Sequence, residues 1–151
     1  MGINFEKFAA EGNEFINELS RNLGHENEKG HVGILLRAVL HTFRNCISVA
    51  QSLNFISQLP MFLKAIYVEQ WKFSEKPERI KSLKEFAKKV EDEQRRFGER
   101  QFEWNEPTID LVKTVFYSLN RYTTPGQIED MLAELPSGIK GLFPESVKIR
   151  V

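Results

Sequence analysis

Apolar residues recur at steps of three and four over most of the chain, the spacing of one face of an α-helix. The first such face runs from Phe5 to Leu23, and the second from Leu35 to Phe43. Shorter stretches of the same kind follow as far as Phe143. Only residues 146–151 alternate weakly, and we expect a short extended tail there. The pattern therefore predicts an all-α protein.

One stretch of sequence occurs twice, 76 residues apart (136 − 60 = 76). Each copy starts with a hydroxyl residue, Ser48 or Thr124, and has a glutamine three positions later, which is the spacing of a helix capping box. Each copy then reaches a Leu-Pro step, where proline ends one helix and begins the next. The apolar stripe of the second helix also repeats at this offset. We therefore expect an internally duplicated helical bundle of two pseudo-two-fold-related units, each with three to four helices.

The repeats set the expected domain limits. The first unit is predicted at residues 1–72 and the second at 79–145, with a linker at 73–78 and a tail at 146–151. A unit of this size has a marginal core alone, so the two units are expected to bury their remaining apolar faces on each other within one compact domain.

Composition narrows the class of protein. The chain has 151 residues, of which 41% are hydrophobic and 28% charged, as in ordinary globular proteins, and its net charge is zero. Bulk charge therefore does not favour nucleic acid or an acidic substrate as a partner. Cys46 is the only cysteine, which excludes an intramolecular disulfide and favours a reducing compartment. With no signal-peptide pattern or membrane-length apolar run, we expect a cytoplasmic protein that does not bind membranes.

Several runs of residues together resemble the domain of unknown function 2267 family. They are RAVLHTFR at 37–44, QLPMFLKAIY at 58–67 with Trp71 behind it, and shorter runs at 126–130, 133–136 and 142–144. The resemblance covers most of residues 13–145 and implies a bacterial, all-helical, duplicated protein. It implies no activity, because the family is named for having none assigned, and it transfers no functional residues to this chain.

The turn after the first helix contains residue types that bind metal ions: His25, Glu26, Glu28 and His31. Polar turns collect such residues without a metal, and the spacing lacks the His-x-x-x-His pattern of a helical site. We therefore favour a solvated turn and assign no metal.

Two residues on the second helix have chemistry of their own. His41, whose counterpart in the second copy is Tyr117, titrates near neutral pH but has no titratable partner close in sequence. A partly buried, hydrogen-bonded ring is favoured over a catalytic one. Cys46 lies at a helix end whose partial negative charge disfavours a thiolate, so a structural cysteine is expected.

Residues 76–100 hold nine basic and six acidic side chains. Arg95, Arg96 and Arg100, with Phe97 and Trp104 nearby, have the composition of a site for single-stranded nucleic acid. The interleaved acids at this spacing favour ion pairs along an exposed helix instead. Nucleic acid is therefore not expected as a partner.

Five aromatic residues follow the predicted fourth and fifth helices: Tyr67, Trp71, Phe73, Phe102 and Trp104. Aromatic residues are enriched in interfaces, and these five form our predicted interaction surface. They also suit the seam between the two packed units, and we favour this second interpretation of their positions.

No phosphate-binding glycine loop, nucleophile elbow or catalytic triad occurs in the sequence, so we expect no enzyme and assign no cofactor. The leading hypothesis is a non-enzymatic helical module that binds another protein or associates with itself. The alternative is a small-ligand or metal-binding protein with a cleft between the two repeats, to which His41 and Tyr117 would contribute polar groups.

Overall fold

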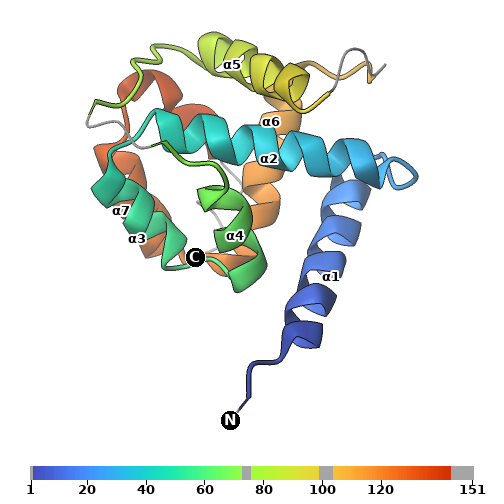
Figure 1. Ribbon diagram of the computed structural model, residues 1–151. Helices are drawn as coiled ribbons and strands as arrows, with labels where there is room; N and C mark the ends of the chain where they lie inside the picture. Colours follow the sequence, from blue (N-terminus) through green and yellow to red (C-terminus); the bar gives the residue numbers. More distant parts are fainter. Residues whose placement is uncertain (1, 73–75, 99–103, 144–151) are drawn as a thin grey trace.

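Helices dominate residues 2–72, 76–98 and 104–143, the part of the chain that the computed structural model describes, and no strand occurs there (Figure 1). The all-α prediction is confirmed. The helices are α1 (Phe5–Leu23), α2 (Lys29–Asn45), α3 (Val49–Ile56), α4 (Met61–Val68), α5 (Leu83–Arg96), α6 (Thr108–Leu119), η1 (Asn120–Tyr122), α7 (Pro125–Glu134) and η2 (Ser137–Leu142). The predicted tail at 146–151 and half of the predicted linker, 73–75, lie outside the described residues.

Local chemistry fixes where the helices begin. Ser48 Oγ accepts the Gln51 amide at 3.1 Å, and the Gln51 side chain accepts the Ser48 amide at 2.9 Å, which is the predicted capping box of α3. Thr124 and Gln127 make the same exchange before α7, at 3.3 and 2.8 Å. Both predicted caps are confirmed.

The end of α3 differs from the prediction, which placed it at Leu59. The α-helix ends at Ile56, and the next residues close tighter turns, because Leu59 donates its amide to Ile56 only three residues back. Pro60 explains the change, since it has no N–H to donate to the carbonyl four residues before it, which is that of Ile56, and its ring clashes with a helical carbonyl there.

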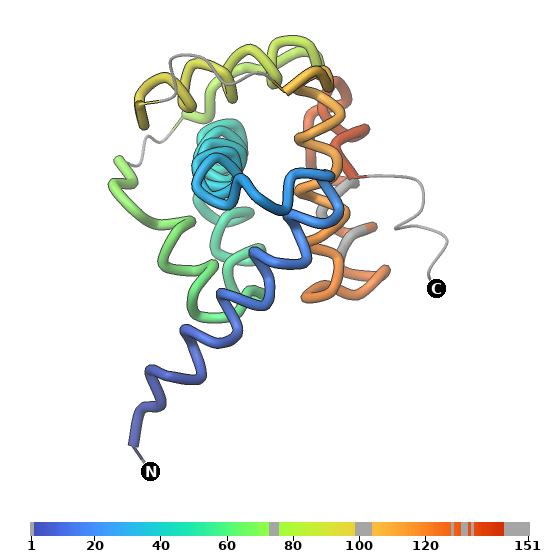
Figure 2. The backbone as a smooth tube through the Cα atoms, turned by 90° about the vertical axis from the view of Figure 1, so that its right-hand side faces the viewer, coloured from blue at the N-terminus to red at the C-terminus, as the bar shows by residue number. Residues whose placement is uncertain are grey.

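The long helix α2 lies at the centre of the molecule (Figures 1 and 2). It packs against α5 on one side and against α1 and α4 on the other, while α6 packs against α1 and α5. Figure 2 shows α5 lying across α2, and α1 running away from the body toward the amino terminus. None of the described helices is both long enough and apolar enough to span a membrane.

Aromatic rings join the two halves of the core. The Phe43 ring on α2 lies 5.2 Å from those of Phe55 and Phe116, and 6.4 Å from that of Phe143, measured between ring centroids. Such edge-to-face contacts bury large apolar areas. Because these rings come from α2, α3, α6 and the end of η2, one continuous core spans the chain.

Not every predicted core position is covered. Leu53 of α3, expected to point inward, is 58% exposed, and Phe5 at the start of α1 is 71% exposed. Each residue lies on an apolar stripe that neighbouring helices cover elsewhere, at Phe55 in α3 and from Phe15 onward in α1. The helical pattern identifies the stripe but does not identify how far along it the covering helix extends.

Candidate functional site

The predicted interaction residues lie in different environments. Tyr67 is fully buried, and its hydroxyl lies 2.7 Å from Ser52 Oγ. Burial raises the pKa of the Tyr67 hydroxyl well above its ordinary value. Tyr67 therefore belongs to the core and cannot meet a partner at the surface. Trp71 is half-buried, and its ring lies perpendicular to that of Tyr67 with the centroids 5.9 Å apart. Phe73 and Phe102 lie outside the described residues.

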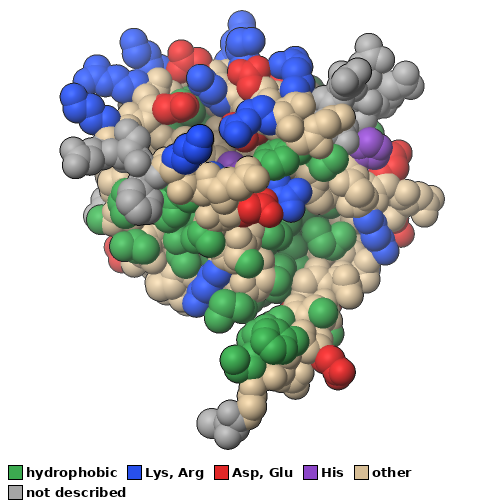
Figure 3. All heavy atoms as spheres, in the orientation of Figure 1, with side chains coloured by type: hydrophobic (Ala, Val, Ile, Leu, Met, Phe, Trp, Pro, Cys, Tyr) green, Lys and Arg blue, Asp and Glu red, His purple; other side chains and the backbone are tan. Residues whose placement is uncertain are grey.

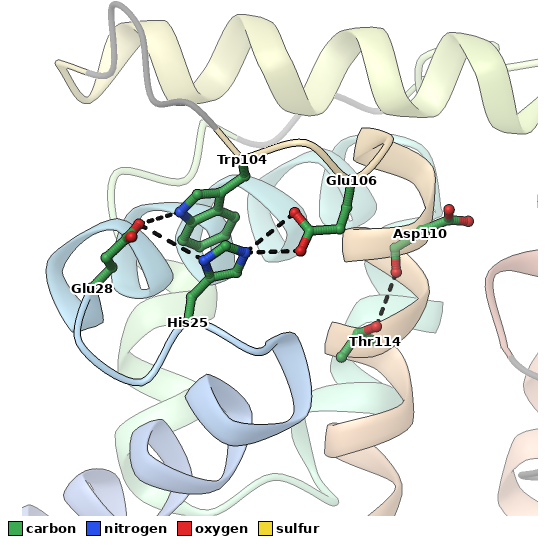
Figure 4. A network of polar contacts seen from close by, with 6 residues as sticks. All are labelled: His25, Glu28, Trp104, Glu106, Asp110 and Thr114. Carbon is green, nitrogen blue, oxygen red and sulfur yellow. Dashed lines mark hydrogen bonds and ion pairs between the residues drawn. The ribbon is translucent and has the colours of Figure 1, made fainter.

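Trp104 lies where the α1–α2 and α5–α6 connections meet (Figure 4). Its indole ring stacks on the His25 ring, with centroids 3.9 Å apart and planes within 9° of parallel. The indole N–H donates to the carboxylate of Glu28. His25 Nε2 lies 3.0 Å from Glu106 Oε1. This Trp104 contact (His25, Glu28, Trp104 and Glu106) joins two connections that lie far apart in sequence.

The Trp104 contact holds two carboxylates without bringing them together. His25 Nδ1 faces Glu28 at 3.9 Å, whereas Nε2 faces Glu106 on the other side of the ring. A hydrogen bond from its own backbone amide, together with one from His25, holds the pKa of Glu106 below its ordinary value. Among the described residues, no three His, Cys, Asp or Glu side chains gather closely enough to hold a metal ion.

A cleft of about 820 Å³ opens between α2, α5 and the segment that follows α4. We call it the Arg44 cleft, after the arginine of α2 that lines it. Trp71 and Phe97 contribute its aromatic walls. Its charged and polar lining also includes His41, Lys72, Lys76, Glu78, Glu93 and Arg96.

Two side chains of α2 hold the carboxyl end of α4 at this cleft. Arg44 Nη1 donates to the carbonyl oxygens of Tyr67 and Glu69, at 2.6 and 2.7 Å. His41 Nε2 lies 2.8 Å from the carbonyl oxygen of Ile66, which can only accept, so this nitrogen carries the proton. Burial lowers the pKa of His41, although the bond to Ile66 works against that shift. The imidazole is therefore neutral at pH 7, as expected of a buried, hydrogen-bonded ring.

The ligand-binding alternative placed His41 and Tyr117 in one cleft, but the structure places them in two different hollows. Tyr117 lines a separate, shallow hollow of about 330 Å³ with Asn22, Lys113 and Thr114. The larger of these two hollows is the Arg44 cleft, lined from both halves of the chain, and Arg44 is the residue that sequence reasoning missed there. Its signal in the sequence is a charged residue directly after Phe43, the last residue of the apolar stripe of the second helix, where burial is common and charge is not.

A second feature is the amino-terminal arm, residues 3–11. Figures 1 and 2 show the start of α1 extending beyond the other helices, and Figure 3 shows hydrophobic side chains gathered over it. Ile3 and Phe5 are each 71% exposed, and the rings of Phe5 and Phe8 meet edge to face at 6.2 Å. Every buried residue of α1 lies at Phe15 or beyond.

The basic face of α5 carries its own carboxylate partners. Arg95 pairs with Asp92 and Arg96 with Glu93, each at 2.9 Å. Arg100 lies outside the described residues. Paired side chains along an exposed helix are what the sequence predicted, and they leave Arg95 and Arg96 less suited to bind phosphates.

The comparisons with known proteins identify a family without an assigned activity. The model of an uncharacterized conserved protein family, DUF2267, matches residues 12–142. No curated protein matches the chain.

Proposed function

We propose that this chain, which belongs to the DUF2267 family, is a non-enzymatic helical module of the bacterial cytoplasm that pairs with a second copy of itself. The observation that carries the proposal is the exposure of Ile3 and Phe5, each 71% exposed on the amino-terminal arm. Exposed apolar side chains that cluster on one face mark interaction surfaces. The single cysteine supports a reducing compartment.

The arm continues the stripe of α1 that forms the core. Phe5, Phe8, Gly12 and Phe15 follow one another at helical spacing, but only Phe15 is buried. Two isolated helical turns are marginal in water, because few hydrogen bonds repay the ordering of the chain. A covering partner would stabilise these turns and remove Phe5 and Phe8 from water.

A second copy fits this surface for two reasons. The half-buried Phe62 lies over Gly12 at the base of the arm, and the adjacent Met61 is 50% exposed, so each copy offers an apolar seat as well as an apolar arm. Lys7 and Glu11 also pair at 4.0 Å on the arm, and two antiparallel arms would place Lys7 of each copy near Glu11 of the other. Such a self-complementary surface is what a two-fold dimer requires.

Sedimentation equilibrium tests this pairing. At tens of micromolar protein we expect a dimer, and we expect the double variant Phe5→Ser, Phe8→Ser to be a monomer. The matched control is Leu53→Ser, which removes an exposed leucine from α3 and should leave the dimer intact. A monomeric parent at about 100 μM, or a dimer that survives the double substitution, contradicts the proposal.

Trp71 and Trp104 remain predictions as interaction residues. Both are half-buried, Trp71 at the Arg44 cleft and Trp104 on His25. If an oligomer survives the arm substitutions but is lost in Trp71→Ala, the interface lies at the cleft and the arm proposal is wrong.

We further propose that the fold is two copies of one four-helix unit. The order α1, α2, α3, α4 is matched by α5, α6, α7, η2, and the starts of α3 and α7, and of α4 and η2, are 76 residues apart. Leu35 and Leu111 are both buried at this offset, as are Leu63 and Ile139. The packing is also reciprocal: α2 of the first unit packs on α5 of the second, and α6 of the second packs on α1 of the first.

Reciprocal packing makes a prediction for separated units. Each unit covers its central helix with a helix of the other, so neither residues 1–72 nor residues 76–151 should fold cooperatively alone. Mixing the two purified fragments should restore a cooperative thermal transition, measured by circular dichroism. A fragment that unfolds cooperatively by itself would contradict this dependence.

A further inference from the structure

We propose that the Arg44 cleft binds a small organic anion whose charged group pairs with Arg44 and Lys72. The apolar or aromatic body of that ligand would lie against Trp71 and Phe97. This inference goes beyond self-association, because the amino-terminal arm contributes nothing to the lining of the cleft. It also gives the ligand-binding alternative a specific site and a specific class of ligand.

Arg44 is a buried cation without a carboxylate partner among the described residues. It is only 7% exposed, and the hydrogen bonds it makes run from Nη1 to two backbone carbonyls. Its Nε is buried and takes no partner. A buried charge is costly unless it is paired, and burial accordingly lowers the pKa of Arg44 despite the carboxylates of Glu93 and Glu69 farther away. An anion in the cleft would supply the missing charge.

Helix capping explains part of this arrangement but not all of it. A cation at the carboxyl end of α4 is favoured by the helix dipole, and the two bonds from Nη1 satisfy carbonyls that the helix leaves open. Capping leaves Nε unused. It also does not explain why a residue that caps α4 lines an open cleft together with other cations.

The cleft has an excess of positive charge. Arg44, Lys72, Lys76 and Arg96 line it, against two carboxylates, Glu78 and Glu93. Glu93 is held by Arg96 at 2.9 Å, and Glu78 faces Lys89 at 3.9 Å. The carboxylates are therefore already engaged by other cations and do not neutralise Arg44.

The aromatic walls suit the body of an organic ligand. The Arg44 guanidinium carbon lies 5.9 Å from the centre of the Trp71 ring, so an anion at Arg44 would lie beside that ring. Phe97 contributes a second aromatic ring to the lining of the cleft. Its ring meets that of His41 edge to face, with the ring centroids 5.7 Å apart. The volume of about 820 Å³ falls in the range of small-molecule sites and exceeds what a bare inorganic ion needs.

Trp71 provides the readout, because it lines the cleft while the only other tryptophan, Trp104, lies at the connections. In a Trp104→Phe protein, fluorescence should change saturably as phenyl phosphate is added. Inorganic phosphate and phenol, each carrying one half of the ligand, should bind at least about tenfold more weakly.

Substitutions then locate the binding site. Arg44→Met should weaken phenyl phosphate binding by at least about tenfold, and Lys72→Glu should weaken it several-fold. Lys72 is exposed, so its substitution remains informative if Arg44→Met fails to fold. The matched control is Arg121→Met, because Arg121 also lies over an aromatic ring, that of Tyr122 at 5.3 Å, but outside the cleft. This control should bind normally.

Three results overturn the inference. They are the absence of saturable binding of phenyl phosphate and benzoate up to about 10 mM, equal binding of phenol, and unchanged binding in both Arg44→Met and Lys72→Glu. Because the dimer is tested at Phe5 and Phe8, failure here is distinguishable from failure of the self-association proposal.

Discussion

Trp104 donates its indole N–H to Glu28, the residue 76 positions before it in the chain. This separation of 76 residues along the chain equals the offset between the two copies of the repeated sequence. Two equivalent residues of a two-fold arrangement touch each other only near its axis, so the contact supports the proposed duplication. It also joins the α1–α2 connection to the α5–α6 connection (Figure 4).

The first prediction concerns this bond. Trp104→Phe keeps an aromatic ring to stack on His25 but removes the N–H donor, and should lower the free energy of unfolding by about 1 kcal/mol. A double-mutant cycle with Glu28→Ala, measured by urea denaturation, should give a coupling energy of about 0.5–1 kcal/mol. Additive effects of the two substitutions would contradict a bond between these side chains.

A second prediction concerns Gly138 in η2. A Cβ atom at this position would lie 1.7 Å from the backbone carbonyl oxygen of Lys81, so the segment before α5 or η2 itself must move. Gly138→Ala should therefore lower the free energy of unfolding by about 1–3 kcal/mol. The control is Gly33→Ala on α2, where an added Cβ meets nothing within 4 Å and should stabilise the helix by about 0.5–1 kcal/mol. If both proteins melt at or above the parent temperature, the close approach is absent in solution.

Short-range features of this fold were predictable from sequence. The caps at Ser48 and Thr124 depend on residues three positions apart, and the buried stripes of α2 and α6 depend on helical spacing, so both follow from the local pattern. The ends of helices were predicted less accurately, as the shorter α3 shows, because a proline also prevents the helical bond at the carbonyl four residues before it.

Long-range features were not predictable. Tyr67 and Trp71 are four residues apart, but Tyr67 packs against Ser52 and Phe55 of α3, whereas Trp71 lines the cleft. Leu53 has the same apolar character as Phe55, but only Phe55 meets Phe43. The Arg44 cleft exists because α5 approaches α2 from the other half of the chain, and no local pattern encodes that approach.

The third prediction concerns Cys46, which the sequence suggested is structural. The thiol is buried and donates to the carbonyl oxygen of Phe43 at 3.2 Å, and burial raises its pKa to about 12. At pH 8 only ~10⁻⁴ of the thiol is ionised, and the thiolate is the reactive form. Iodoacetamide should therefore leave the native protein unmodified over hours and modify it fully in guanidinium, as followed by mass spectrometry. The control is a protein with both Cys46→Ala and Leu53→Cys, which should react while native because position 53 is exposed. Rapid reaction of the native parent protein would contradict the burial of Cys46.

The last prediction is a pH dependence that comes from His41. Its folded-state pKa lies below the ordinary value of 6.5, chiefly because burial disfavours the charged ring, and the nearby Arg44 acts in the same direction. Below pH 6.5 the unfolded chain therefore binds a proton that the folded protein does not bind. This contribution to stability is complete above pH 6.5 and is lost as the pH falls through the folded-state pKa, at no more than about 1.4 kcal/mol per pH unit.

The variant His41→Gln isolates this effect, because glutamine retains a donor for the Ile66 carbonyl but does not titrate. Urea denaturation at pH 7.5, 6.5, 5.5 and 5.0 should show the parent losing stability faster than the variant as the pH falls. The advantage of the parent should therefore be largest at pH 7.5. Parallel pH profiles for the two proteins would mean that His41 keeps its ordinary pKa in the folded state, and that the ring is more accessible to water than its bond to Ile66 implies.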